Sequence, residues 1–282
     1  MILISIIGLG FVGNAIHNSF ITKINEGNID KYQVIGYDKY KNGGIGKFED
    51  CLNSQIIFLA LPTPFDNKLN TYDYSAIHEI CEKLKENKYD GIIVLKSTME
   101  PTMTQQLYEK YNLNLIHNPE FLTASTAYED FHNQKHIVLG YLKHEYDNKN
   151  KYILVKELYS ELYPGAEISE CTSDESECMK IFCNTFYSVK LQYFNELYFI
   201  CDKVQADYNN VKNIMLKNGW INPMHTTVPG TDGKYSYGGL CFPKDTNALL
   251  QFMKKNNLPS KVLEATVTER NEMRDDHDNI KF

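Results

Sequence analysis

The feature that most constrains this chain is a glycine-rich turn close to its N-terminus. A run of mostly β-branched apolar residues, Ile2–Ile7, leads directly into Gly8-Leu9-Gly10-Phe11-Val12-Gly13, and a helical pattern follows from Asn14. A short apolar run of this kind is typical of a buried parallel strand. In such a strand–turn–helix unit the first glycine permits the tight turn, the second lets a pyrophosphate approach the backbone, and the third lets the helix pack on the strand. Because a helix N-terminus favours phosphate, the spacing predicts a dinucleotide site at Gly8, Gly10, Phe11, Val12 and Gly13.

An acidic residue at the end of the next predicted strand indicates which dinucleotide is bound. Asp38 directly follows the apolar run Gln33–Tyr37. A carboxylate at this position can bind both ribose hydroxyls and repels a 2′-phosphate, so NAD is favoured over NADP. The gap between Gly13 and Asp38 is a little longer than usual, and we assign the excess to a loop around Glu26–Asn28. The alternative is that Asp38 is an ordinary turn residue at a strand end.

Further strand candidates recur along the first half of the chain with helical patterns between them. They are Gln55–Leu61, Gly91–Lys96, Leu113–His117 and His136–Gly140. This alternation predicts an α/β fold with a doubly wound parallel sheet of the Rossmann type. Ligands of such sheets bind beyond the carboxyl ends of the strands. Polar residues follow three of those ends, at Thr63, at Lys96-Ser97-Thr98 and at Asn118–Leu122.

The second half of the chain has the pattern of an all-helical domain. Thr172 and Glu175 form a capping box at the start of a helical pattern that reaches about Lys203. Lys180 and Asn184, four residues apart, lie together on one face, where an ammonium and an amide can donate to an oxyanion. A solvated surface pair is the alternative. On a roughly opposite face, apolar residues at helical spacing predict a packing stripe of Phe182, Phe186, Val189, Tyr193, Leu197 and Ile200.

A lone thiol follows a loop rich in glycine, proline and threonine, Asn218–Gly239. Cys241 stands within Gly238–Asp245, where the proline suits the first position of a helix. Unpaired backbone N–H groups, the positive end of a helix dipole and the neighbouring Lys244 all favour thiolate over thiol. The alternative is a buried structural cysteine beside a turn. A last helical pattern covers Ser260–Arg274.

Composition limits the classes of partner. A net charge of −7 argues against a nucleic-acid binder, and 43% hydrophobic with 23% charged residues is typical of a soluble globular protein. The 7 cysteines show no metal-ligand spacing, so we expect no metal. We find no secretory leader or spanning segment, and therefore expect a cytoplasmic protein without a membrane partner. A length of 282 residues allows two domains, which we place at 1–170 for cofactor binding and 171–282 for the helical part.

Taken together, these motifs resemble the UDP-glucose/GDP-mannose dehydrogenase family of sugar-nucleotide oxidoreductases, from the N-terminus to about residue 272. The resemblance implies oxidation of the C6 alcohol of a nucleotide sugar to a carboxylate by two NAD molecules in turn, with UDP-glucose the commonest substrate. It also implies a homodimer formed through the long helix that joins the domains, with a contribution from Ser260–Arg274. The matching segments are Gly8–Gly13, Thr63-Pro64, Lys96-Ser97-Thr98, Asn118–Leu122, Lys180 with Asn184, Asn195-Glu196 and Gly238–Asp245.

The resemblance also implies roles for single residues. Cys241 would attack the aldehyde intermediate to form a thiohemiacetal, whose oxidation gives a thioester that is then hydrolysed. Lys180 and Asn184 would stabilise the oxyanion, while Asp245 and Thr98 would hold or activate water. The cofactor would be bound by Gly8, Gly10, Phe11, Val12, Gly13, Asp38, Thr63, Ser97 and Thr98. The sugar nucleotide would be bound by Glu120, Phe121, Leu122, Lys180, Asn184, Tyr237 and Gly238.

The chain departs from the family's pattern in three ways. Ala124 stands where the family has a second glutamate linked to proton transfer, and losing a general base typically costs about 10²–10⁴-fold in rate. His225 stands where the family commonly has an arginine that reaches a neighbouring subunit's substrate, and histidine is a poorer clamp. The family's C-terminal nucleotide-binding domain is not found, so we expect the loop, another subunit or a separate protein to hold the nucleotide.

Three functions therefore stay open. The joint presence of Cys241, Lys180, Asn184 and Asp245 favours a sugar-nucleotide dehydrogenase. Ala124 favours a protein that binds NAD and a sugar nucleotide with impaired or no turnover. The third is a related NAD enzyme such as a β-hydroxyacid dehydrogenase, which uses a catalytic lysine and needs no thiol.

Overall fold

The computed structural model describes residues 1–276 and divides the chain into two compact units. The first comprises Met1–Thr63 and Asp73–Lys180, and the second comprises Pro64–Tyr72 and the chain from Ile181 onward. The short segment Pro64–Tyr72 thus belongs to the second unit although its neighbours in sequence belong to the first. The predicted boundary near residue 170 stays a proposal, and each unit is described by itself.

The first unit is built on a seven-stranded sheet with the order β2-β1-β3-β6-β7-β8-β9. The first five of these pair in parallel, as predicted, with Ile4 of β1 opposite Ile56 of β3. The predicted Rossmann-type α/β fold and its strands are confirmed, with ends that differ by one or two residues. The strands are β1 (Ile2–Ile7), β2 (Tyr32–Tyr37), β3 (Ile56–Leu59), β6 (Ile92–Leu95), β7 (Asn114–His117), β8 (His136–Tyr141) and β9 (Glu167–Thr172).

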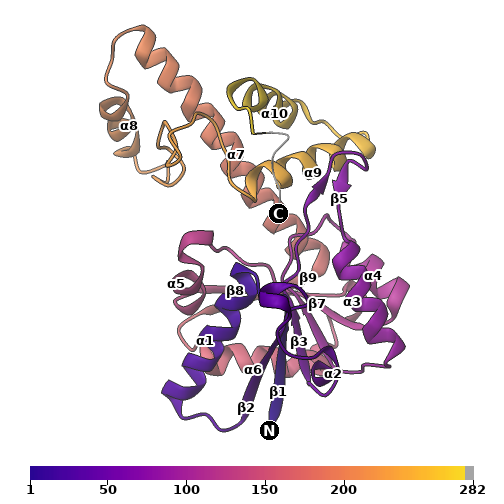
Figure 1. The fold of residues 1–282 in the computed structure, drawn as a ribbon. Helices are drawn as coiled ribbons and strands as arrows, with labels where there is room; N and C mark the ends of the chain where they lie inside the picture. The colour runs from indigo at the N-terminus through magenta and orange to yellow at the C-terminus, as the bar shows by residue number, and fades with distance from the viewer. Residues whose placement is uncertain (277–282) are drawn as a thin grey trace. The chain divides into compact units, whose positions relative to one another are not determined.

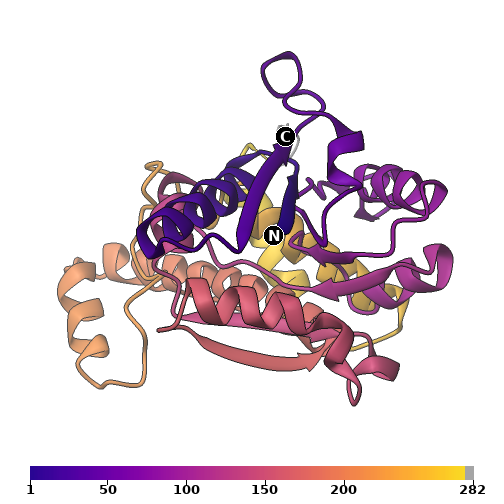
Figure 2. The same ribbon diagram turned by 90° about the horizontal axis from the view of Figure 1, so that it is seen from below.

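The prediction that the whole sheet is parallel is wrong at one edge. β8 runs antiparallel to β7, with His117 opposite Gly140, and β9 then pairs in parallel with β8. The connection between β7 and β8 contains the short helix α5 (Ala127–His132), which has 6 residues. β9 was not among the predicted strands because this edge strand is polar and only half-buried. Figure 2, which views the fold from below, shows it as a long salmon arrow.

Helices cover both faces of this sheet. Figure 1 shows α1 (Phe11–Gly27) and α5 on one side and α3 (Ser75–Glu86) and α4 (Met103–Tyr111) on the other. α1 begins at Phe11, three residues before the predicted start. The remaining elements of this unit are α2 (Phe48–Cys51), α6 (Ile153–Leu162) and 3₁₀ turns at Lys41–Gly43, Ala124–Thr126, Lys143–Glu145 and Lys149–Tyr152.

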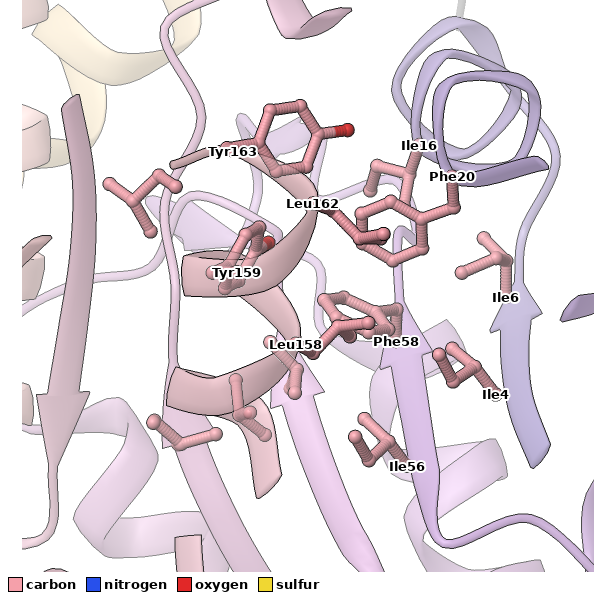
Figure 3. Close-up of a cluster of buried hydrophobic side chains, with 14 of the residues drawn as sticks. Ile4, Ile6, Ile16, Phe20, Ile56, Phe58, Leu158, Tyr159, Leu162 and Tyr163 are labelled. Atoms are coloured by element: carbon pink, nitrogen blue, oxygen red, sulfur yellow. The ribbon is translucent and has the colours of Figure 1, made fainter. Parts of the chain in front are cut away.

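The core between α1, α6 and the sheet fixes the position of the glycine turn. Phe20 of α1 is fully buried and packs edge-on against Phe58 of β3, with 5.3 Å between ring centroids. Tyr159 of α6 packs against the same two rings, and Figure 3 shows these side chains converging with Ile4 and Ile6 of β1. Because α1 and β1 share one core, the turn between them is held at both ends.

The second unit is helical apart from a small hairpin. The hairpin pairs β4 (Phe65–Asp66) with β5 (Thr71–Tyr72) in antiparallel fashion. The predicted capping box is confirmed, because Thr172 N and Oγ1 donate to Glu175 Oε2 at 2.8 and 2.9 Å. The helix that it begins continues from the first unit into the second. The helices are α7 (Ser173–Lys203), α8 (Tyr208–Leu216), α9 (Phe242–Lys255) and α10 (Lys261–Met273).

The long helix α7 buries a polar face and exposes an apolar one. Four members of the predicted packing stripe are more than half exposed in this single chain: Phe182 (51%), Phe186 (63%), Tyr193 (52%) and Ile200 (59%). On the buried face, Glu177 accepts hydrogen bonds from Thr102 N and Thr104 N, each at 2.7 Å, and from Thr104 Oγ1 at 2.6 Å. Its carboxylate therefore caps α4. Among the described residues, no helix is long and apolar enough to span a membrane.

Candidate functional site

The glycine turn after β1 has the backbone geometry that a dinucleotide requires. Gly8 has φ = +88°, and a Cβ there would lie 2.6 Å from the carbonyl oxygen of Ala60. A Cβ on Gly13 would lie 1.8 Å from the carbonyl oxygen of Gly8, so both positions demand glycine. At Gly10, by contrast, a Cβ would meet nothing described within 4 Å, which leaves open space at the N-terminus of α1. A tight turn, a close helix approach and an open middle position fit a pyrophosphate.

Asp38 lies beside this turn and is tied to it. Its Oδ2 accepts from Leu9 N at 2.7 Å, and its Oδ1 accepts from Tyr40 N and Lys41 N at 2.9 and 2.8 Å. Lys41 Nζ in turn donates to Leu9 O at 2.6 Å. Burial raises the pKa of Asp38, but the three backbone donors outweigh it and the pKa is lowered overall. An ionised carboxylate at the end of β2 suits a ribose diol, and this contact stays a prediction.

Polar residues at the ends of β3 and β6 come together as predicted. Thr63 Oγ1 donates to Thr98 O at 3.0 Å, and Ser97 Oγ donates to Leu61 O at 2.6 Å. All three polar residues are buried. These contacts join the two strand ends at the carboxyl edge of the sheet, where ligands of this fold bind.

A buried lysine, which the sequence analysis treated only as part of a motif, anchors the loop after β7. Lys96 Nζ donates to Asn118 Oδ1 at 2.8 Å, and Tyr159 OH donates to the same oxygen at 2.5 Å. Asn118 Nδ2 donates to Val138 O at 2.7 Å, which secures the other end of the amide. Burial lowers the pKa of Lys96 to about 7. This network holds the start of the segment Asn118–Leu122.

The same segment meets Lys180 of α7. Lys180 Nζ donates to Glu120 O, lies 3.6 Å from Glu120 Oε1 and sits 4.9 Å from the centroid of the Phe121 ring. Glu120 Oε2 accepts from Leu122 N at 2.5 Å. Lys180 is therefore no solvated surface lysine. Four residues predicted to bind substrate lie together within the first unit.

In the second unit, the thiol stands at the start of a helix. Cys241 is the N-cap residue of α9, with Pro243 in the first turn, and it is half-buried. Lys244, expected beside the thiol, directs its ammonium to Asp245 Oδ1 at 2.5 Å instead. The predicted helix start is therefore confirmed, while the neighbouring charge is committed to a carboxylate.

Asp245 is the centre of a buried polar cluster in this unit. It has no exposed surface, and its Oδ2 accepts from Asn184 Nδ2 at 2.6 Å. Its Oδ1 accepts from Tyr72 OH at 2.5 Å as well as from Lys244. The sequence analysis missed Tyr72, which lies 173 residues from Asp245 in the chain. The two residues meet because the hairpin Pro64–Tyr72 belongs to the second unit.

The loop that precedes Cys241 is fastened by the chain's two arginines. Arg270 Nε donates to Tyr237 O at 3.2 Å, and Arg274 Nη1 donates to Tyr235 O at 3.0 Å. A Cβ on Gly238 would lie 2.4 Å from Arg274 Nη2, so any side chain at this position would have to displace the guanidinium. Tyr237 is buried, and burial raises its pKa to about 12. Both arginines thus bind backbone within the second unit.

Two departures from the family pattern also have a place in the structure. Ala124 lies exposed in the 3₁₀ turn Ala124–Thr126, where its methyl group offers no proton. His225 stacks on Tyr187, with 4.6 Å between ring centroids, and meets Phe242 edge-on at 5.4 Å. Its imidazole therefore packs beside the start of α9, and burial followed by the charge of Lys190 lowers its pKa.

A Rossmann-type unit with an open glycine turn, followed by a helical unit with a thiol at a helix start, defines the class of nicotinamide-dinucleotide oxidoreductases that carry a helical second domain. Sequence comparison gives the family. The family's NAD-binding domain matches residues 46–163, and its central domain matches residues 174–272. The chain belongs to the UDP-glucose/GDP-mannose dehydrogenase family, and its cofactor is NAD.

Individual relatives agree with this assignment. A UDP-glucose 6-dehydrogenase of Rickettsia bellii is 32% identical over 266 residues, which cover 90% of this chain and 58% of that protein. The chain thus spans less than two thirds of that relative's length. A UDP-glucose dehydrogenase of Pyrobaculum islandicum has the same fold, with a TM-score of 0.78, 21% identity, and coverage of 96% of this chain and 68% of that one. The 3-hydroxyisobutyrate dehydrogenase of Mycobacterium tuberculosis shares the fold too, with a TM-score of 0.73, 13% identity, and coverage of 98% and 95%.

Proposed function

We propose that the chain oxidises the C6 alcohol of a nucleotide sugar, with UDP-glucose to UDP-glucuronate the leading candidate, through a covalent intermediate on Cys241. The observation that carries this proposal is the cluster in which buried Asp245, one helical turn beyond Cys241, holds the Asn184 amide at 2.6 Å. A thiol that caps a helix can act as a nucleophile, and an amide oriented by a buried carboxylate can donate to an oxyanion. A β-hydroxyacid dehydrogenase needs no such thiol.

NAD, when bound, accepts a hydride in each of the two oxidations. Between the two oxidations, the Cys241 sulfur forms a C–S bond to the aldehyde carbon, and the carbonyl oxygen becomes an oxyanion. Asn184 and Lys180 donate to that oxyanion. After the second oxidation the intermediate is a thioester. Water then attacks its carbonyl carbon, the C–S bond breaks, and the electron pair returns to sulfur.

Proton transfer in this reaction requires a general base, and Ala124 has no carboxylate that could act as one. Glu120 belongs to the same segment, is almost buried, and has Lys180 Nζ 3.6 Å from its Oε1. We assign proton transfer to Glu120 and the holding of water to Thr98. Asp245 already accepts three hydrogen bonds of 2.5–2.6 Å, so we assign it to orienting Asn184.

The cofactor and sugar contacts remain as the sequence predicts them. We propose that Gly10, Phe11 and Val12 present backbone N–H groups to the pyrophosphate, and that Asp38 binds a ribose. Thr63, Ser97 and Thr98 would then border the nicotinamide end. The sugar nucleotide would contact Glu120, Phe121, Leu122, Tyr237 and Gly238.

We further propose a cytoplasmic homodimer formed through α7. The exposed apolar residues Phe182, Phe186, Tyr193 and Ile200 recur at spacings of four and seven residues, so they form one stripe along the helix. A stripe of this kind on a helix whose opposite face is buried favours a second copy of the same chain.

The decisive measurement is NADH release on mixing the protein with NAD and a panel of nucleotide sugars led by UDP-glucose. We expect about two NADH per sugar consumed, and loss of turnover in Cys241→Ala. The control is Cys183→Ala, which removes another half-buried cysteine. NAD binding without release of NADH from any sugar nucleotide would contradict the proposal and favour a binding protein. Turnover of a 3-hydroxy acid that survives Cys241→Ala would favour the β-hydroxyacid class.

A further inference from the structure

The hairpin Pro64–Tyr72 brings one phenol to the buried cluster of the second unit. Tyr72 is 1% exposed, and its hydroxyl donates to Asp245 Oδ1 at 2.5 Å. Lys244 Nζ donates to the same oxygen at 2.5 Å and lies 4.7 Å from the centroid of the Tyr72 ring. The ring and the hydroxyl thus contact both members of the Lys244–Asp245 ion pair.

This arrangement divides the donors between the two carboxylate oxygens. Oδ1 accepts from Tyr72 and Lys244, and Oδ2 accepts from Asn184 Nδ2 at 2.6 Å. An ionised carboxylate only accepts hydrogen bonds, so it fixes which end of the Asn184 amide faces it. The second N–H of that amide then points away from Oδ2.

We propose that Tyr72 is a positioning residue, which holds the Asp245 carboxylate so that the second N–H of Asn184 points at the oxyanion. The inference rests on the proposed function for the identity of that acceptor. Without the phenol, Oδ1 keeps one donor, the carboxylate gains rotational freedom, and the direction of the Asn184 amide is no longer fixed. A hydrogen bond to a buried charged group stabilises by about 1.5–3 kcal/mol, which corresponds to roughly 10–150-fold in rate.

The first test needs no turnover. In protein labelled with ¹⁵N-asparagine, and with the resonance assigned by loss in Asn184→Ala, the Asn184 side-chain amide of the wild type should exchange slowly with solvent. Tyr72→Phe keeps the ring beneath Lys244 and should speed that exchange at least about tenfold. The matched control is Tyr208→Phe, which removes another buried phenol of the same unit that donates to Thr226 O at 2.6 Å. It should leave the exchange unchanged.

The second test is kinetic. Tyr72→Phe should lower kcat roughly 10–150-fold with little change in KM for NAD, and in an Asn184→Ala background the same change should cost less than about twofold. Fast exchange of the Asn184 amide in the wild type, exchange unchanged by Tyr72→Phe, or additive effects on kcat would each overturn the inference. If the wild type releases no NADH, the proposed function fails, and the amide exchange still decides the role of Tyr72.

Discussion

Alanine at two glycines of the same turn should separate folding from cofactor binding. In Gly13→Ala the new Cβ would stand 1.8 Å from the carbonyl oxygen of Gly8, so the first turn of α1 must move by about 1.5 Å to restore an ordinary contact. That helix carries Ile16 and Phe20, both fully buried, and any shift disturbs their packing. Overpacking of this kind costs about 1–3 kcal/mol, and a clash with backbone lies at the upper end. We expect the melting temperature to fall by roughly 5–10 °C.

Gly10→Ala should have the opposite profile. Gly10 has φ = −64° and ψ = −165°, which alanine adopts, and its Cβ would meet nothing within 4 Å among the described residues. Stability should therefore change by less than about 1 kcal/mol. The methyl group would fill the space through which a pyrophosphate reaches the backbone. Loss of one charge-assisted hydrogen bond, about 1.5–3 kcal/mol, raises Kd for NAD roughly 10–150-fold.

Calorimetric unfolding and titration with NAD measure both quantities on the same samples. Gly165→Ala is the matched control, because its Cβ would also meet nothing described within 4 Å, in an exposed turn after α6. An unchanged melting temperature in Gly13→Ala would refute the close approach of α1 to β1. An unchanged Kd in Gly10→Ala would refute the position of the pyrophosphate.

Two further predictions concern α7. Burial raises the pKa of Glu177 to about 7 from its ordinary value of 4.5, so the folded state binds this proton more tightly than the unfolded state. Its contribution to the free energy of unfolding is complete below about pH 4.5 and falls by up to about 1.4 kcal/mol per pH unit as the pH rises to about 7. The stability difference between wild type and Glu177→Gln should shrink over this window in denaturant titrations, and a constant difference would count against the assignment. If the proposed dimer forms through α7, Phe186→Lys should convert it to monomer in sedimentation experiments, since burying this side chain contributes about 2 kcal/mol per copy. Leu258→Lys, at another exposed apolar residue, should leave the proposed dimer intact.

Local signals in the sequence predicted a large part of the fold. The glycine turn, the strands with their polar ends and the capping box at Thr172 each depend on neighbours within a few residues. The features that were missed depend on distant contacts. β9 is a polar edge strand, which is held by pairing with β8 and carries little apolar pattern of its own. The reversal of β8 is set by its pairing with β7, a contact that the local apolar pattern of β8 does not show.

The candidate site also has some features that local sequence predicts and others that depend on distant contacts. Cys241 and its helix start are local features, and so is the spacing of Lys180 and Asn184. The hydrogen-bond partners of Lys180 and Asn184 could not be predicted from local sequence. Lys180 contacts Glu120 and Asn184 contacts Asp245, and each partner is about 60 residues away in the chain. Tyr72 carried no signal, because a tyrosine in a short hairpin is usually only a packing residue. A hydrophobic pattern also shows that α7 has two faces, but does not show which of them is buried.

The buried face of α7 is polar, and its residues contact three different segments of the chain. Glu177, Lys180 and Asn184 follow one another by three and four residues, so they lie on one face within about 10 Å along the helix axis. Each serves a different segment: Glu177 caps α4, Lys180 binds the segment at Glu120, and Asn184 binds Asp245 near the thiol. Burying three polar side chains is costly unless each one is paired, and each one is. Within the first unit, α7 thus contacts both α4 and the segment at Glu120, and within the second unit it contacts Asp245. The exposed apolar face is the surface on which the proposed homodimer depends.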